Sequence, residues 1–190
     1  MKRFIFIAAV VLAASYFAMP SRAQAQDMKP SATAPKPALG PSAALLEEWN
    51  DIGRRLIAIA EDMPEDKYDF KPKPEMRTWV SQLTHAAQAN YYFINPVLGK
   101  PLPKDDPDPA GLKTRAQVAA FVKKCFEEGA ELIKAQGDAG MSKPVQLGDQ
   151  MYRTDALGYD LIAHANEHYG QLVVYYRLNG LVPPESRPKK

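Results

Sequence analysis

The chain contains three histidines, and two of them, His164 and His168, lie four residues apart in a segment with helical periodicity. Successive residues of an α-helix turn by about 100°, so this spacing puts the two imidazoles on one face, about 40° apart. Helices commonly offer two nitrogen ligands to one metal ion in this way. The pair therefore indicates a metal site; two hydrogen-bonded histidines of a protein core are the alternative.

The helical face that carries this pair is otherwise apolar. Its members follow one another in steps of four and three: Leu157, Leu161, His164, His168, Leu172 and Tyr175. Two imidazoles buried side by side repel each other when both are protonated and need partners when both are neutral, and a shared cation resolves this conflict. Asp160 and Gln171 lie close to the same line, one turn before and one turn after the pair. Both are candidates to orient a metal ligand or a substrate.

The third histidine, His85, is harder to place from the pattern. It lies in another helical segment, roughly opposite the centre of that segment's aliphatic stripe. A helix in a bundle contacts two neighbours, so a broad apolar arc could still turn His85 inward. An exposed histidine fits the pattern equally well, and periodicity leaves both options open.

Four segments with helical periodicity must position these residues. They cover about residues 43–63, 78–98, 114–137 and 154–179. Residues 142–153 could hold a short extended piece, and no stronger strand pattern occurs. This organisation predicts an all-α fold, namely a four-helix bundle. Two connections are long, so the helices need not follow a simple up-and-down order.

Residues at the ends of the segments carry start and stop signals. Ser42 is the expected N-cap of the first helix. Pro96 is expected to break the second helix. Thr114 and Gln117 have the spacing of a capping box at the start of the third, and Gly137 and Gly140 are expected to end it.

Residues 1–25 have the parts of a secretory signal peptide: a basic start, an apolar run over residues 4–18, and small residues up to Ala25. An apolar run of about fifteen residues is shorter than the ~20 that a membrane-spanning helix needs. We therefore expect cleavage after Ala25 and a secreted or periplasmic protein. The proline- and alanine-rich residues 26–42 are expected to form a flexible, disordered linker.

Charge and cysteine content narrow the classes of function. Residues 1–25 contain three basic residues and no acidic ones, so the processed chain has 21 basic and 22 acidic residues and a net charge of −1. This balance gives no general attraction for nucleic acid, and we expect no membrane association after signal cleavage. The single cysteine, Cys125, falls at an apolar helical position, which favours a buried core thiol.

Two segments resemble signatures of a known protein superfamily. Residues 76–91, which include His85, resemble the second-helix signature of the DinB/YfiT-like superfamily. Residues 164–184 resemble its last-helix signature, and the stretch 63–72 between the first two helices is also similar. Order and spacing match, and the likeness covers about residues 43–184.

The resemblance implies a DinB-like four-helix bundle, with residues 185–190 as a C-terminal tail. It also implies one divalent metal ion, most often zinc or nickel, bound by His85, His164 and His168. Three protein ligands leave positions for water or a substrate, which is typical of catalytic metal sites. Members of the superfamily include metal-dependent transferases and isomerases that use low-molecular-weight thiols, and also proteins without an established reaction. Many form dimers, so a homodimer is one expected arrangement.

The leading hypothesis is a metal-dependent hydrolase or thiol-type transferase that acts on a small molecule. In such enzymes the metal lowers the pKa of a bound water or thiol. Secretion favours the hydrolase, because low-molecular-weight thiols are scarce outside the cytoplasm. The candidate catalytic residues are Asp160, Glu167 and Gln171.

Two other interpretations stay open. Residues 164–168 match the H-x-x-E-H pattern of inverzincin metalloproteases, with Glu167 as the general base. On a helix, however, Glu167 projects about 60–100° away from the two imidazoles. The second interpretation is a non-catalytic envelope protein that binds a metal or a small ligand.

Overall fold

The computed structural model describes residues 37–104 and 111–188, which belong to one structural unit. The expected signal peptide, residues 1–25, lies outside the described residues, as do residues 26–36 of the expected linker. Within the described ranges, no helix is both long enough and apolar enough to cross a lipid bilayer.

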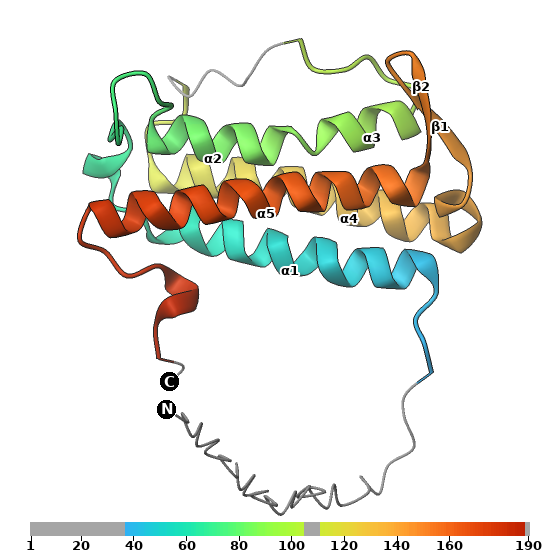
Figure 1. The fold of residues 1–190 in the computed structure, drawn as a ribbon, viewed down its shortest axis with the longest axis horizontal. Helices are drawn as coiled ribbons and strands as arrows, with labels where there is room; N and C mark the ends of the chain where they lie inside the picture. The colour runs from blue at the N-terminus through green and yellow to red at the C-terminus, as the bar shows by residue number, and fades with distance from the viewer. Residues whose placement is uncertain (1–36, 105–110, 189–190) are drawn as a thin grey trace, which may run out of the picture. The chain divides into compact units, whose positions relative to one another are not determined.

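The described chain is helical except for one hairpin. In order, its elements are α1 (Pro41–Asp62), the 3-10 turn η1 (Glu65–Lys67), α2 (Trp79–Gln88), α3 (Tyr91–Val97), α4 (Arg115–Met141), β1 (Pro144–Leu147), β2 (Gln150–Arg153), α5 (Thr154–Leu178) and the 3-10 turn η3 (Pro184–Ser186). Because α2 and α3 follow one line, the helices form four rods (Figure 1). This confirms the four-helix architecture expected from the sequence, in a fold that is mostly helical.

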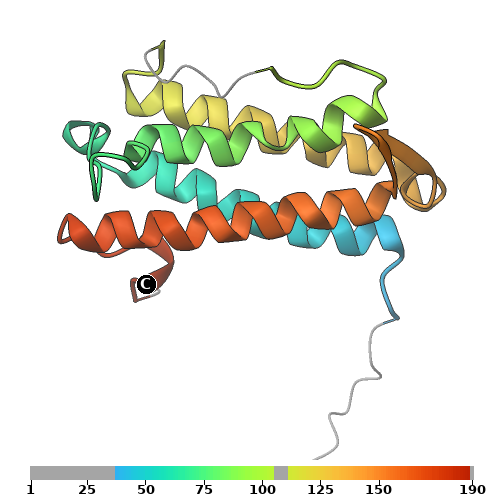
Figure 2. The ribbon, with the colours of Figure 1, turned by 45° about the horizontal axis from the view of Figure 1, so that its top comes forward.

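The four rods surround one core. α1 packs against α4 and α5, and the α2–α3 rod packs against the same two helices from the other side. α1 and α5 run away from the hairpin end of the bundle, whereas α2, α3 and α4 run toward it (Figures 1 and 2). Since α3 and α4 run in the same direction, the order of the helices is not simply up and down.

The apolar stripe of α1 shows how the core is filled. Its members are at most 1% exposed: Leu45, Trp49, Ile52, Leu56, Ile59 and Met63. The Trp49 ring lies between those of Phe93 and Phe126, with centroid distances of 5.5 and 5.7 Å. Its indole N–H donates to the Phe126 carbonyl at 2.9 Å, so the buried polar atom is paired. Cys125 is fully buried, which confirms the expected core thiol.

The second rod is broken at Ala89 and Asn90, and the expected break near Pro96 was wrong. At this point the Asn90 amide donates to the carbonyl three residues before it, a tighter turn than in an α-helix. The Asn90 side chain is buried, and its Nδ2 lies 3.5 Å from the Cys125 carbonyl oxygen. Pro96 lies inside α3, which continues to Val97 although proline has no N–H to bond the carbonyl four residues before it.

The N-cap of α1 is Gly40 and not Ser42, so the last two residues of the expected linker belong to the helix. Ser42 instead donates from its backbone N and its Oγ to Oδ1 of Asp138, at 2.9 and 2.5 Å. Asp138 follows Gly137, whose φ of 55° interrupts the helical geometry of α4. Gly137 therefore ends the main run of α4, as expected, but about one further turn follows it.

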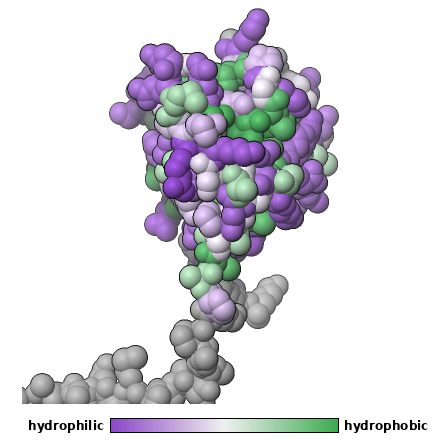
Figure 3. Space-filling model, turned by 90° about the vertical axis from the view of Figure 1, so that its right-hand side faces the viewer, coloured by the Kyte–Doolittle hydropathy of each residue, from purple (hydrophilic) through white to green (hydrophobic). Residues whose placement is uncertain are grey.

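The remaining local predictions concern α4 and the hairpin. The capping box at the start of α4 is present. Residues 142–153, which could hold a short extended piece, form the antiparallel pair β1 and β2, with Val145 opposite Tyr152. Gly148 makes the turn with a φ of 62°. The end of the bundle that carries the hairpin exposes mainly hydrophilic side chains, with hydrophobic ones among them (Figure 3).

The residues expected to begin a C-terminal tail contact α1. The Arg54 guanidinium donates to Glu185 at 2.5 Å, and Arg187 donates two hydrogen bonds to the Asp62 carboxylate, at 2.7 and 2.6 Å. These hydrogen bonds from Arg187 hold the pKa of Asp62 below its usual range. Exposed ion pairs of this kind contribute about 0–1 kcal/mol each. They fix the described end of the chain beside α1.

Candidate metal centre

α2 turns His85 toward α5. The helix begins at Trp79 because the Oγ1 of its N-cap, Thr78, accepts a hydrogen bond from the Ser81 amide at 3.1 Å. Its apolar residues Val80, Leu83, Ala86 and Ala87 are at most 4% exposed and pack in the core. His85 lies beside these residues and is partly buried. The question that periodicity left open is therefore settled in favour of an inward orientation.

α5 presents His164 and His168 from successive turns. His168 is 7% exposed and His164 is partly buried. The hydroxyl of Tyr175, further along α5, donates to the carbonyl of Arg77, just before α2, at 2.9 Å. This hydrogen bond joins α5 to the start of α2 and so helps to hold the two histidine-bearing helices in register.

The three imidazoles meet between these helices. One nitrogen of each ring can be chosen so that all three lie within 4.8 Å of one another. The ring centroids are 4.3 Å apart for His164 and His168, 4.9 Å for His85 and His168, and 5.4 Å for His85 and His164. His85, which precedes His164 by 79 positions, thus joins the two α5 histidines in one nitrogen-rich cluster.

The ring nitrogens of the cluster satisfy one another only in part. Nε2 of His168 lies 3.0 Å from Nε2 of His164, a hydrogen bond in which one ring donates its N–H and the other accepts. Nδ1 of His164 is buried and has no hydrogen-bond partner among the described residues. A buried polar atom without a partner costs about 1–3 kcal/mol of folding stability, so stabilising the fold is not a sufficient reason for this cluster.

The surroundings keep the α5 histidines neutral. Burial, followed by repulsion from His168 and His85, lowers the pKa of His164 to about 4. Burial also lowers the pKa of His168, although its hydrogen bond with Gln171 opposes this effect. Near pH 7 both rings are therefore uncharged, and each offers a nitrogen lone pair.

These features fit a divalent transition-metal ion. Imidazole nitrogen is a ligand that zinc, nickel, copper and iron accept, and metal-bound histidine must be neutral. The three rings converge closely, and the two on α5 are held uncharged. The residues that would hold the ion are those expected from the sequence, His85, His164 and His168.

The other candidates from the sequence occupy different positions around the cluster. Oε1 of Gln171 lies 2.9 Å from Nδ1 of His168. Glu167 is exposed and accepts a hydrogen bond from Nε2 of Gln171 at 3.2 Å. Asp160 is exposed, one turn before His164. Gln171 therefore contacts a histidine directly, and Glu167 is joined to the cluster through Gln171.

Gln82, which no sequence pattern singled out, also lies against the cluster. Its Nε2 lies 2.5 Å from Nδ1 of His168, and the side chain is 5% exposed. Gln82 precedes His85 by three residues and so lies on the same face of α2. This spacing was the available signal, but it gains meaning only once His85 is known to face α5.

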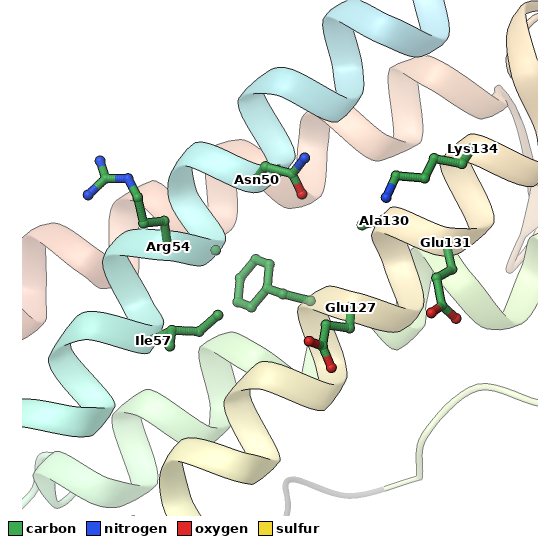
Figure 4. A pocket seen from close by; sticks show the side chains of 9 residues that line it. Asn50, Arg54, Ile57, Glu127, Ala130, Glu131 and Lys134 are labelled. Carbon is green, nitrogen blue, oxygen red and sulfur yellow. The ribbon is translucent and has the colours of Figure 1, made fainter.

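A surface groove of about 300 Å³ lies elsewhere, between α1 and α4 (Figure 4). Gly53 and Phe126 are among the residues that line it, and its polar lining consists of Asn50, Arg54, Glu127, Glu131 and Lys134. No histidine lines it. The groove and the histidine cluster are therefore separate features of the bundle.

Sequence comparison connects most of the bundle to one family. Residues 48–172, about two thirds of the chain, match the family model described as the DinB superfamily. This range includes all three histidines. No match was found among curated proteins.

Solved structures show a similar fold. A DinB-like protein from Bacillus cereus matches with a TM-score of 0.66 and 18% sequence identity, covering 75% of this chain and 95% of the other. The DinB-like protein YjoA from Bacillus subtilis matches with a TM-score of 0.60 and 16% identity, covering 77% and 99%. At these identities the likeness concerns the fold.

Proposed function

The chain belongs to the DinB superfamily, and on this premise we propose that it is a metal-dependent enzyme acting on a small molecule. His85, His164 and His168 would hold one divalent ion, with zinc or nickel the first candidates. The observation that carries the proposal is the convergence of three imidazoles from α2 and α5, with ligand nitrogens within 4.8 Å of one another.

The chemistry follows from the donor set. When bound, the ion would act as a Lewis acid that lowers the pKa of a water molecule or a thiol. Three protein ligands leave coordination positions for that molecule and for a substrate, whereas structural zinc sites have four. This favours a hydrolase or a thiol-type transferase over a purely structural ion.

The chain's own polar residues have separate parts in this proposal. Gln171 contacts the outer nitrogen of His168 and so fixes a ligand. Glu167 is exposed beside it and is the candidate to accept a proton at the open side of the site. Asp160, exposed one turn before His164, is the candidate to contact a substrate.

We further propose that the protein works outside the cytoplasm, because residues 1–25 have the pattern of a cleaved signal peptide. A hydrolase suits that compartment better than a thiol transferase, since its co-substrate is water. The mass of the chain recovered from the periplasm or medium tests this point. Cleavage after Ala25 predicts a chain that starts at Gln26, whereas an intact Met1 would contradict it.

The reaction can be tested with the processed chain, residues 26–190, loaded with zinc or nickel. Chromogenic esters and amides report hydrolysis, and a chromogenic electrophile with a low-molecular-weight thiol reports transfer. We expect turnover by the loaded protein and none after chelation or in a His164→Ala variant. A protein that retains its metal but turns over neither substrate class would be the alternative, a metal- or small-ligand-binding envelope protein.

A further inference from the structure

Two glutamine side chains enclose the outer nitrogen of His168. Nε2 of Gln82 lies 2.5 Å from Nδ1 of His168, and Oε1 of Gln171 lies 2.9 Å from the same atom. Gln82 also donates its amide N–H to Oε1 of Gln171. Gln171 in turn donates to Oε1 of Glu167 at 3.2 Å. Through these amides, α2 and α5 are joined at a single imidazole nitrogen.

Burial makes this contact persistent. Gln82 is 5% exposed and His168 is 7% exposed, so water does not readily replace either partner. A buried amide that lost its partners would cost about 1–3 kcal/mol. Gln82 and His85 lie one turn apart on α2, and that turn therefore carries both a cluster histidine and the contact to His168.

Proton placement explains why the two amides would matter to a metal. If Nε2 of His168 is to offer a lone pair, its proton must sit on Nδ1, which then needs an acceptor. Oε1 of Gln171 is such an acceptor. Nε2 of Gln82 only donates and cannot bond a protonated Nδ1, so in this state the Gln82 amide donates to Oε1 of Gln171 and keeps that carbonyl turned toward the ring.

The neighbouring histidine has no such support. Nδ1 of His164 is buried without a hydrogen-bond partner in the described part of the chain. The orientation of His164 therefore depends on packing, whereas that of His168 is set by two side chains from two helices. The difference singles out the Gln82–Gln171 pair as a specific feature of one ligand.

We propose that Gln82 is a positioning residue of the metal centre: acting through Gln171, it holds His168 with Nδ1 protonated and Nε2 directed at the other two imidazoles. This inference rests on the proposed metal site and adds to it a residue on α2 that does not itself bind the ion. Its expected effect is on metal affinity and on the tautomer of His168.

The test compares three variants of the processed chain. Gln82→Met keeps the length of the side chain and removes its hydrogen bonds, and Gln171→Met does the same on α5. Thr84→Val is the matched control, because Thr84 is buried on α2 but its hydroxyl bonds only to carbonyls of its own helix. Zinc affinity is measured by competition with a chromophoric chelator, and ¹⁵N NMR of the zinc-loaded protein reports the tautomer of His168.

We expect Gln82→Met and Gln171→Met each to weaken zinc binding about 10–100-fold, and Thr84→Val to leave it unchanged. The double variant should bind zinc no more weakly than Gln171→Met, because Gln82 acts through Gln171. In the wild type, His168 should show a protonated Nδ1 and a zinc-bound Nε2. In Gln82→Met, that population should fall.

The opposite results are distinguishable. If Gln82→Met keeps both the affinity and the tautomer, or if the two effects are additive, the positioning role is refuted while the metal site stands. A wild-type chain that binds no zinc or nickel would overturn the metal site and this inference together. If Gln82→Met does not fold, Gln171→Met carries the test, and unchanged zinc affinity in that variant refutes the role.

Discussion

The contact between α1 and α4 and the contact between α2 and α5 are built from different residues. α1 and α4 fit large rings against glycines. A Cβ added to Gly129 would lie 2.1 Å from an atom of the Trp49 ring, and one added to Gly53 would lie 2.8 Å from the Phe126 ring. This contact is stabilised by burial of apolar surface and by close packing.

The contact between α2 and α5 contains imidazoles and amides, whereas the contact between α1 and α4 contains large aromatic rings and glycines. Its members are His85, His164, His168, Gln82 and Gln171. One of its buried nitrogens, Nδ1 of His164, lacks a partner among the described residues. The difference indicates a division of work: the α1–α4 contact holds the bundle together, and the α2–α5 contact gathers the imidazoles that we propose bind a metal ion.

The largest expected effect on stability is at Trp49. Trp49→Ala should lower the free energy of unfolding by about 3–5 kcal/mol, since it leaves a cavity in the apolar contact. Zinc affinity of the folded protein should not change. Denaturant unfolding and zinc titration measure the two quantities, with the exposed Leu178→Ala as a control expected to change stability by less than about 0.5 kcal/mol. A parallel loss of zinc affinity in Trp49→Ala would refute the division of work.

Two glycine substitutions compare the packing of the α1–α4 contact with an open position on α5. Gly129→Ala should destabilise the protein by about 1–3 kcal/mol, because the new methyl group meets the Trp49 ring. Gly170→Ala on α5 has open space at its Cβ and should stabilise the helix by about 0.5–1 kcal/mol. Thermal or denaturant unfolding checks both signs. Equal effects in the same direction would show that the α1–α4 contact is not closely packed.

Acid should affect the α2–α5 contact selectively. The pKa of His164 is lowered from 6.5 to about 4 in the folded protein, so between these values the unfolded chain binds more protons. The stability of the metal-free protein should therefore decrease as the pH falls from about 6.5 to about 4, by about 1–2 kcal/mol after solvent screening. Denaturant unfolding in chelator over this pH range measures it. His164→Ala should lose less stability over the same range, and an equal loss would exclude His164 as the source.

Much of the fold could be predicted because its signals are local. The apolar stripe of α1 and the capping box at Thr114 follow from short-range periodicity and side-chain chemistry. So does the common face of His164 and His168 on α5. These features depend on residues within one or two helical turns, where sequence spacing determines which side chains meet.

The remaining features depend on partners far away in the sequence. Ser42 has the chemistry of an N-cap, yet it bonds to Asp138, 96 residues further on. The second rod breaks at Asn90, whose buried side chain lies beside the Cys125 carbonyl of α4. In the sequence, Gln82 is an ordinary polar residue of a helix, and only the structure shows that it contacts His168. Such tertiary contacts override local preference, and no single helix displays them.

The metal content of the processed, untagged protein shows directly whether the three histidines bind an ion. Plasma mass spectrometry would compare the wild type with a His85→Ala, His164→Ala, His168→Ala variant, and circular dichroism would check that both are helical. We expect about one zinc or nickel ion per wild-type chain and none in the variant, with the helical signal preserved. No metal in the wild type after loading, or equal metal in both proteins, would contradict this expectation.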